Sequence, residues 1–356
     1  MKKSIFTLVM LVMVAAVIGG AWSLARKYIN RGEDLNKKAW ESSYLERGLP
    51  VPESGPREGY WGARLGEKVR DGRTVWREPE IHLAGLIDID GLGRQYYRSA
   101  GEVKYRILIM GGSVASGANA SGIPATYFSV IGDELERRGL PVEIVIVAAG
   151  AWKSSQELQA LEPNLQTLRP DLVVFLNGLN DLTNGSTSLT LYGEPTATQD
   201  GSPWSVLYHA HDYQQRVSDY LSNITAARKM TVAGGASLLV ALQPSLTERS
   251  RRTPIEERLL ELTLESHAPD ALATSYGAIR KSLAGMTRSG NFSFLDCSRV
   301  LDTEKETVFT DIWHFTDFGH RALGLFMADK IAGILKNRVD TGKDRSNQTS
   351  ADGRRH

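Results

Sequence analysis

The chain has 356 residues, of which 42% are hydrophobic and 23% charged, which is an ordinary composition for a globular protein. Its formal net charge is +1 and its Lys and Arg residues are scattered, so the charge pattern predicts no nucleic-acid partner. Cys297 is the single cysteine, which excludes an internal disulfide bond and a thiolate metal cluster.

An apolar segment lies near the start of the chain. Ser4–Ala25 contains 22 residues without a charge and follows Met1-Lys2-Lys3. As a helix rising 1.5 Å per residue it would be about 33 Å long, enough for a hydrocarbon core of about 30 Å. We expect residues 1–25 to form a transmembrane anchor, with a cleaved signal segment as the alternative. We expect the rest of the chain to lie outside the cytoplasm (in the periplasm of a bacterium), although the basic residues flanking the segment nearly balance.

The next part of the chain, residues 26–103, has the character of a connecting region. Residues 26–50 are polar and charged, which is typical of a stalk. Residues 51–101 are rich in Gly, Arg and Trp and include alternating stretches such as Ile81–Asp90, which predict a small β-rich lead-in.

From residue 104 to 336, short apolar runs alternate with segments of helical spacing. We predict strands at Tyr105–Met110, Glu143–Ala149, Leu172–Leu176, Ser237–Leu242 and Phe292–Leu295. We predict helices at Thr126–Arg138, Ser155–Leu168, Ser205–Ala233, Glu256–Met286 and Asp317–Leu335. Strands that are apolar on both faces and joined by helices indicate a five-stranded parallel sheet in an α/β domain, with ligands bound beyond the carboxyl ends of the strands.

Two segments depart from this alternation. Leu182–Trp204 is rich in Gly, Ser, Thr and Pro, and its length and position predict a lid or specificity loop. Residues 337–356 are polar, and we expect a disordered tail there.

A serine, a histidine and an aspartate have positions suited to nucleophilic catalysis. Ser113 follows the first predicted strand in Gly111-Gly112-Ser113, with a helix expected to begin nearby. His314 stands three residues after Asp311 in a loop before the last helix. A serine hydroxyl needs a general base, and the base needs an orienting acid. Alternatively, Ser113 caps a helix or binds a phosphate, and Asp311 caps a turn while His314 packs on aromatic rings.

Two further residues follow the second and third predicted strands. Gly150 offers an unobstructed backbone N–H, and Asn180 offers a side-chain amide. Such donors stabilise the anionic tetrahedral intermediate of ester cleavage. Each alone is also a common turn residue, so the prediction depends on their joint occurrence.

These four blocks resemble those of the SGNH hydrolase superfamily, also called GDSL-type esterases and lipases. The matching blocks are Gly111-Gly112-Ser113, Ala148-Ala149-Gly150, Gly178-Leu179-Asn180-Asp181 and Asp311-Ile312-Trp313-His314. The resemblance covers residues 104–336 and implies a flavodoxin-like three-layer α/β/α domain without a cofactor. It implies Ser113 as nucleophile, His314 as base and Asp311 as orienting acid, with Ser113, Gly150 and Asn180 forming the oxyanion hole. The family's usual Gly-Asp-Ser is Gly-Gly-Ser here, which makes the substrate harder to infer.

Three tryptophans and two histidines are further candidates for binding. Trp152, Trp204 and Trp313 are candidates for packing on sugar rings, with ordinary core packing as the alternative. His209 and His211 lack a third ligand in the sequence, so we predict no metal site there.

The sequence therefore predicts a membrane-anchored serine esterase acting on small-molecule or glycan esters, in particular O-acetyl groups on an envelope glycan. One alternative is an O-acyltransferase that uses the same triad with a sugar hydroxyl as acceptor. Another is a catalytically silent glycan-binding or scaffold protein. The sequence predicts no specific protein partner.

Overall fold

The structure, a computed structural model, describes residues 35–52, 69–71, 75–77, 80–84, 87–183, 212–264, 269–287 and 292–340. The predicted anchor at residues 1–25 and nearly all of the predicted lid lie outside these residues. Among the described helices, none combines the length and the apolar character needed to cross a membrane.

A six-stranded sheet forms the centre of the described molecule, with the strand order β10-β9-β8-β6-β7-β5. Its strands are β5 (Arg94–Arg98), β6 (Tyr105–Gly111), β7 (Val142–Ala148), β8 (Leu172–Asn177), β9 (Ser237–Leu242) and β10 (Phe292–Asp296). Strands β6 to β10 run parallel, and β5 pairs with β7 in the antiparallel direction. The α/β architecture predicted from the sequence is confirmed.

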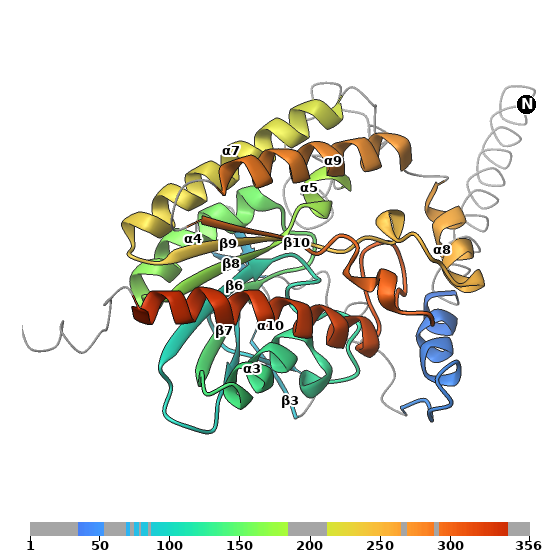
Figure 1. The fold of residues 1–356 in the computed structure, drawn as a ribbon, viewed down its shortest axis with the longest axis horizontal. Helices are drawn as coiled ribbons and strands as arrows, with labels where there is room; N and C mark the ends of the chain where they lie inside the picture. Colours follow the sequence, from blue (N-terminus) through green and yellow to red (C-terminus); the bar gives the residue numbers. More distant parts are fainter. Residues whose placement is uncertain are drawn as a thin grey trace, which may run out of the picture.

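Helices cover both faces of the sheet (Figure 1). Helices α3 (Tyr127–Arg137) and α10 (Asp317–Asp340) pack on one face, against side chains such as Ile107 and Ile109. Helices α4 (Ser154–Leu168), α7 (Asp212–Ala233) and α9 (Pro269–Met286) pack on the other, against Leu108 and Met110. The side chains of a strand alternate between its faces, so both sets of strand residues are buried.

Smaller elements complete the described fold. These are the antiparallel pairs β1 (Val69–Asp71) with β2 (Val75–Arg77) and β3 (Ile81–Leu83) with β4 (Ile87–Ile89), the helices α5 (Leu179–Thr183) and α8 (Pro254–Leu264), and three short 3₁₀ turns at Ile123–Ala125, Leu246–Glu248 and Val300–Thr303.

The structure corrects four sequence-based expectations. The sheet has a sixth, antiparallel strand, because β5 from the lead-in pairs along the edge of β7. The expected stalk is helical at residues 35–45 and lies against the α/β unit, with the ring of Trp40 buried. The single helix expected over Glu256–Met286 is two helices, α8 and α9. Residues 337–340, expected to belong to a disordered tail, instead continue α10 to Asp340, and the rest of the predicted tail lies outside the described residues.

Candidate active site

The candidate site lies where three neighbouring parallel strands end. In the sheet register, Gly111 at the end of β6 pairs with Ala148 of β7 on one side and with Leu176 of β8 on the other. Ser113 and Gly150 each follow the end of their strand by two residues, so these chain segments leave the sheet at the same edge. The topology thus places the first three sequence blocks together, as expected for a parallel α/β sheet.

Ser113 lies in a compact turn that leads away from β6. Its carbonyl oxygen accepts the N–H of Ala118 at 3.0 Å and the hydroxyl of Ser116 at 2.8 Å. The hydroxyl of Tyr127, the first residue of α3, donates to the carbonyl of Ala115 at 2.8 Å. The helix predicted from Thr126 begins at Tyr127, and backbone and hydroxyl hydrogen bonds hold the turn that leads to it from Ser113.

Asp311 and His314 lie at the tip of a short hairpin. Phe309 and Phe315 form an isolated antiparallel bridge, and their rings meet edge to face at 5.4 Å. The N–H of Thr310 donates to the carbonyl of His314 at 3.0 Å, which closes the turn. This turn, here called the acid–base hairpin (residues 308–316), brings the fourth sequence block to the strand ends.

A continuous chain of hydrogen bonds joins Ser113, His314 and Asp311. Ser113 Oγ lies 2.7 Å from His314 Nε2, and His314 Nδ1 lies 2.7 Å from Asp311 Oδ2. The second carboxylate oxygen of Asp311 accepts the backbone N–H groups of Trp313 and His314, both at 2.7 Å. The three side chains therefore stand in hydrogen-bond contact in the order that a nucleophile, a base and an orienting acid would require.

The environment of Asp311 favours its ionised form. Burial alone would raise the pKa of this carboxyl, but the charge of His314 and the hydrogen bonds from His314 and Trp313 outweigh it, and the net pKa is lowered. An ionised Asp311 accepts the Nδ1–H of His314 and so leaves Nε2 to accept a proton from Ser113.

Asn180 lies beside the turn that contains Gly150. Its amide Nδ2 donates to the carbonyl of Trp152 at 2.9 Å. Between Gly150 and Trp152, Ala151 adopts φ 64°, a conformation that residues with a side chain rarely adopt. The two predicted oxyanion residues are therefore in neighbouring, linked segments next to the Ser113 turn.

The two tryptophans predicted to bind sugar have different surroundings. Trp152 is only 4% exposed and packs in the core against α4 and α7, so its ring does not offer a face to a sugar, and that prediction is wrong. Trp313 is half-buried, with its ring centroid 6.5 Å from that of His314, and its indole N–H donates to Thr183 Oγ1 at 3.1 Å. Trp204 lies outside the described residues.

Sequence reasoning missed the role of Asp181. Its buried carboxylate accepts the N–H of Ser154, the first residue of α4, at 3.1 and 3.2 Å and its hydroxyl at 2.5 Å. Burial raises the pKa of Asp181 to about 6, and burial together with the charge of Asp181 raises that of Glu157. Asp181 thus ties the segment of Asn180 to the helix that follows the Gly150 turn. The one available signal was an acid directly after Asn180 in the third block.

The described residues contain no group of three or more His, Cys, Asp or Glu side chains arranged to hold a metal ion. His209 and His211 lie outside them.

No protein-family model and no curated protein matches this chain, and the similar proteins are solved structures. An acetyl xylan esterase is 15% identical, with 64% of this chain and 99% of that chain covered and a TM-score of 0.42. A catalytic mutant of an acetylxylan esterase from Geobacillus stearothermophilus is 12% identical, with 64% and 94% covered and a TM-score of 0.42. A GDSL-like lipase from Bacteroides thetaiotaomicron is 14% identical, with 66% and 89% covered and a TM-score of 0.38.

Proposed function

We propose that this protein is a serine esterase that works through an acyl intermediate on Ser113. The observation that carries the proposal is the chain of two 2.7 Å contacts from Ser113 through His314 to Asp311. This geometry lets the imidazole accept the hydroxyl proton as the oxygen attacks. A catalytically silent binding protein has no need of such a chain, so the complete triad favours activity.

The proposed reaction has two halves. In the first, Ser113 Oγ attacks the ester carbonyl carbon while His314 Nε2 takes its proton; the tetrahedral intermediate then collapses, and His314 returns the proton to the departing alcohol. In the second, His314 takes a proton from water, the hydroxide formed attacks the acyl carbon, and Ser113 leaves with the proton restored. Asp311 stays ionised throughout and stabilises the imidazolium form of His314.

The oxyanion of the intermediate needs fixed donors. We assign the backbone N–H groups of Ser113 and Gly150 and the side-chain amide of Asn180 to this role. The amide nitrogen of Asn180 carries two N–H bonds. One donates to the carbonyl of Trp152, and that bond fixes the direction of the second.

We propose small acyl esters as substrates, in particular O-acetyl groups on a glycan. The position of Trp313 beside His314 supports this, since an indole face packs well on the apolar face of a sugar ring. The test is acetate release from p-nitrophenyl acetate and from an O-acetylated polysaccharide by the full-length protein in detergent, with Ser113→Ala as the control. We expect release that is lost in the variant. Equal release by both proteins would overturn the proposal, and adding a sugar acceptor to the same assay would detect acyl transfer.

We also propose that the apolar segment 4–25 anchors the protein in a membrane with its catalytic part outside the cytoplasm. The length and lack of charge of the segment support this. Cell fractionation combined with digestion of intact spheroplasts by an added protease tests both points. A protein found in the soluble fraction, or a catalytic part protected from the protease, would contradict the proposal.

A further inference from the structure

The segment that precedes the α/β domain reaches the acid–base hairpin. Its described part is helical at residues 35–45 and continues as a turn to Gly48. Leu35 and Ala39 belong to the same buried cluster as Phe309 and Phe315 of the hairpin. This N-terminal helix is therefore packed against the part of the domain that carries Asp311 and His314.

One set of contacts holds the segment that enters the hairpin. Glu46 accepts the N–H of Thr307 at 2.6 Å through one carboxylate oxygen and its hydroxyl at 2.9 Å through the other. Arg47 donates to the carbonyl of Thr307 at 3.2 Å. The backbone N–H and the carbonyl of Thr307 are thus both bonded to charged side chains of the turn that follows the N-terminal helix.

A second set holds the chain where it leaves the hairpin. The hydroxyl of Tyr44 donates to Asp317, the first residue of α10, and the guanidinium of Arg47 lies 4.0 Å from the ring centroid of Phe318. Asp317 also accepts the N–H and hydroxyl of Ser121 at 2.7 and 2.5 Å. Ser121 belongs to the loop that follows Ser113. Tyr44 therefore bonds to the same carboxylate, Asp317, that connects this loop to the chain just after His314.

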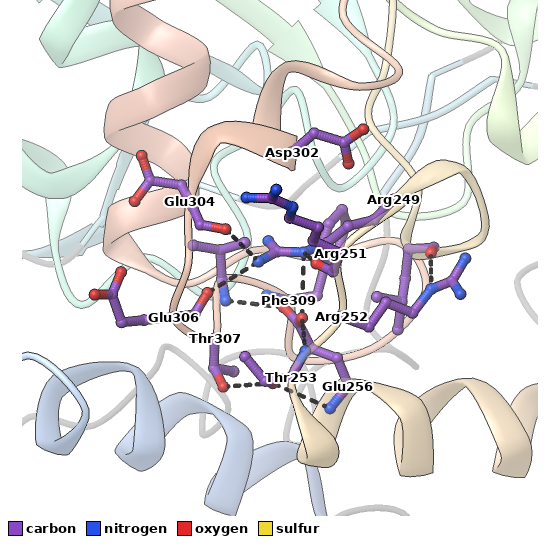
Figure 2. Close-up of polar contacts among 12 residues, drawn as sticks. Arg249, Arg251, Arg252, Thr253, Glu256, Asp302, Glu304, Glu306, Thr307 and Phe309 are labelled. Atoms are coloured by element: carbon purple, nitrogen blue, oxygen red, sulfur yellow. Dashed lines mark hydrogen bonds and ion pairs between the residues drawn. The ribbon is translucent and has the colours of Figure 1, made fainter.

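The same entering segment is held from inside the domain by the buried ion pair of Arg249 and Glu256 (Figure 2). Glu256 accepts the N–H groups of Val308 and Phe309 at 3.0 and 3.1 Å. Arg249, with its Nε 3.2 Å from Glu256, donates to the carbonyls of Glu304 and Glu306 at 2.9 and 3.1 Å. The backbone groups of residues 304–309 thus find their hydrogen-bond partners in side chains of other segments. The turn after the N-terminal helix supplies the partners at Thr307.

We propose that Tyr44, Glu46 and Arg47 are positioning residues for His314, so that the segment before the domain sets the reactivity of the site. The inference rests on the proposed esterase function. The three residues contact the chain on both sides of the hairpin, whose tip must keep His314 within hydrogen-bond reach of Ser113. A displacement of about 1 Å in a catalytic group can lower a rate by about 100-fold, because attack requires aligned atoms.

The test uses the full-length protein in detergent and the double variant Tyr44→Phe/Glu46→Ala. The matched control is Glu41→Gln, on the same helix, where the carboxylate pairs only weakly with Lys37 at 3.9 Å. We expect kcat for p-nitrophenyl acetate and the rate of labelling by a fluorophosphonate to fall at least about 10-fold with an unchanged KM, while the control keeps the original values. Glu46→Gln retains one acceptor oxygen and should retain more activity than Glu46→Ala.

Each outcome separates this inference from the proposed function. An unmodified protein with neither turnover nor labelling would remove the esterase assignment. Normal turnover in the unmodified protein and kcat within twofold in the double variant would overturn the positioning role alone. A lower melting temperature with unchanged rates at 25 °C would also overturn it, because the helix would then only stabilise the fold. Should the double variant fail to fold, Tyr44→Phe and Glu46→Gln measured singly give the same comparison.

Discussion

Gly112 and Asn180 approach each other so closely that a Cβ atom added to Gly112 would lie 2.3 Å from Asn180 Nδ2. The same atom would lie 3.2 Å from the carbonyl oxygen of Trp152, which accepts the Asn180 amide. Space, and not backbone conformation, therefore requires glycine here. The second glycine of Gly111-Gly112-Ser113 is thus coupled to where Asn180 lies in this protein.

We predict that Gly112→Ala lowers kcat by about 10-fold to 100-fold, because Asn180 must move away from the oxyanion position. The matched control is Gly101→Ala, since a Cβ at Gly101 meets nothing within 4 Å. Steady-state kinetics on an acetyl ester measure both. Normal kcat in Gly112→Ala would show that Asn180 tolerates displacement and is not an essential donor.

Removing the amide of Asn180 itself should cost more. We predict that Asn180→Ala lowers kcat by about 10²–10³, the usual cost of losing one oxyanion donor. The loss should appear in kcat more than in KM, because the donor acts on charge that develops in the transition state. An unchanged kcat would exclude Asn180 from the oxyanion hole.

The carboxylate of Asp311 should matter through the tautomer and charge of His314. Asp311→Asn keeps the size of the side chain but removes the charge, and we predict a fall in kcat of about 10³–10⁴ near pH 7. Circular dichroism checks that the fold is intact. A fall of less than about tenfold would mean that His314 is oriented adequately by the hairpin backbone alone.

The buried carboxyl of Asp181 predicts a specific pH dependence of stability. Its folded-state pKa is raised to about 6 from an ordinary 3.8, so ionisation costs more in the folded than in the unfolded state. The penalty is absent below about pH 4, grows through pH 4–6 and reaches about 3 kcal/mol above it.

Asp181→Asn removes this penalty. The unfolding free energy of the variant minus that of the unmodified protein should therefore increase from pH 4 to pH 8 by up to about 3 kcal/mol. Urea unfolding at the two pH values, with Asp219→Asn on α7 as an exposed control, measures this difference. A difference that is constant with pH would mean that burial does not raise the pKa of Asp181 in the folded protein.

Much of the fold was predictable because its strands are buried on both faces. The continuous apolar runs at β6 and β9 follow from that burial, and such runs indicate a buried parallel strand clearly. Strand β5 was missed because its sequence, with Arg94, Arg98 and a half-exposed face, suits an antiparallel edge and lacks an apolar run. The division of α8 from α9 had a signal in Pro269, since proline favours the first turn of a helix.

The site was predictable at the level of residue types and order, but not of packing. Ser113, Asp311 and His314 meet because parallel strand ends and the last loop share one edge, which the motif order indicates. The burial of Trp152 could not be deduced, because a tryptophan after a strand end suits a core as well as a cleft. The docking of the N-terminal helix had a signal in the spacing of Leu35, Ala39, Trp40 and Tyr44, which places these four side chains on one helix face.

The most direct test of the central claim is reaction of the full-length protein with a serine-directed fluorophosphonate, followed by mass mapping of the adduct. Activation of Ser113 by His314 predicts one adduct, at Ser113, that is lost in His314→Ala while the protein remains folded. An adduct at another residue, or labelling of Ser113 that persists in His314→Ala, would contradict the proposed triad.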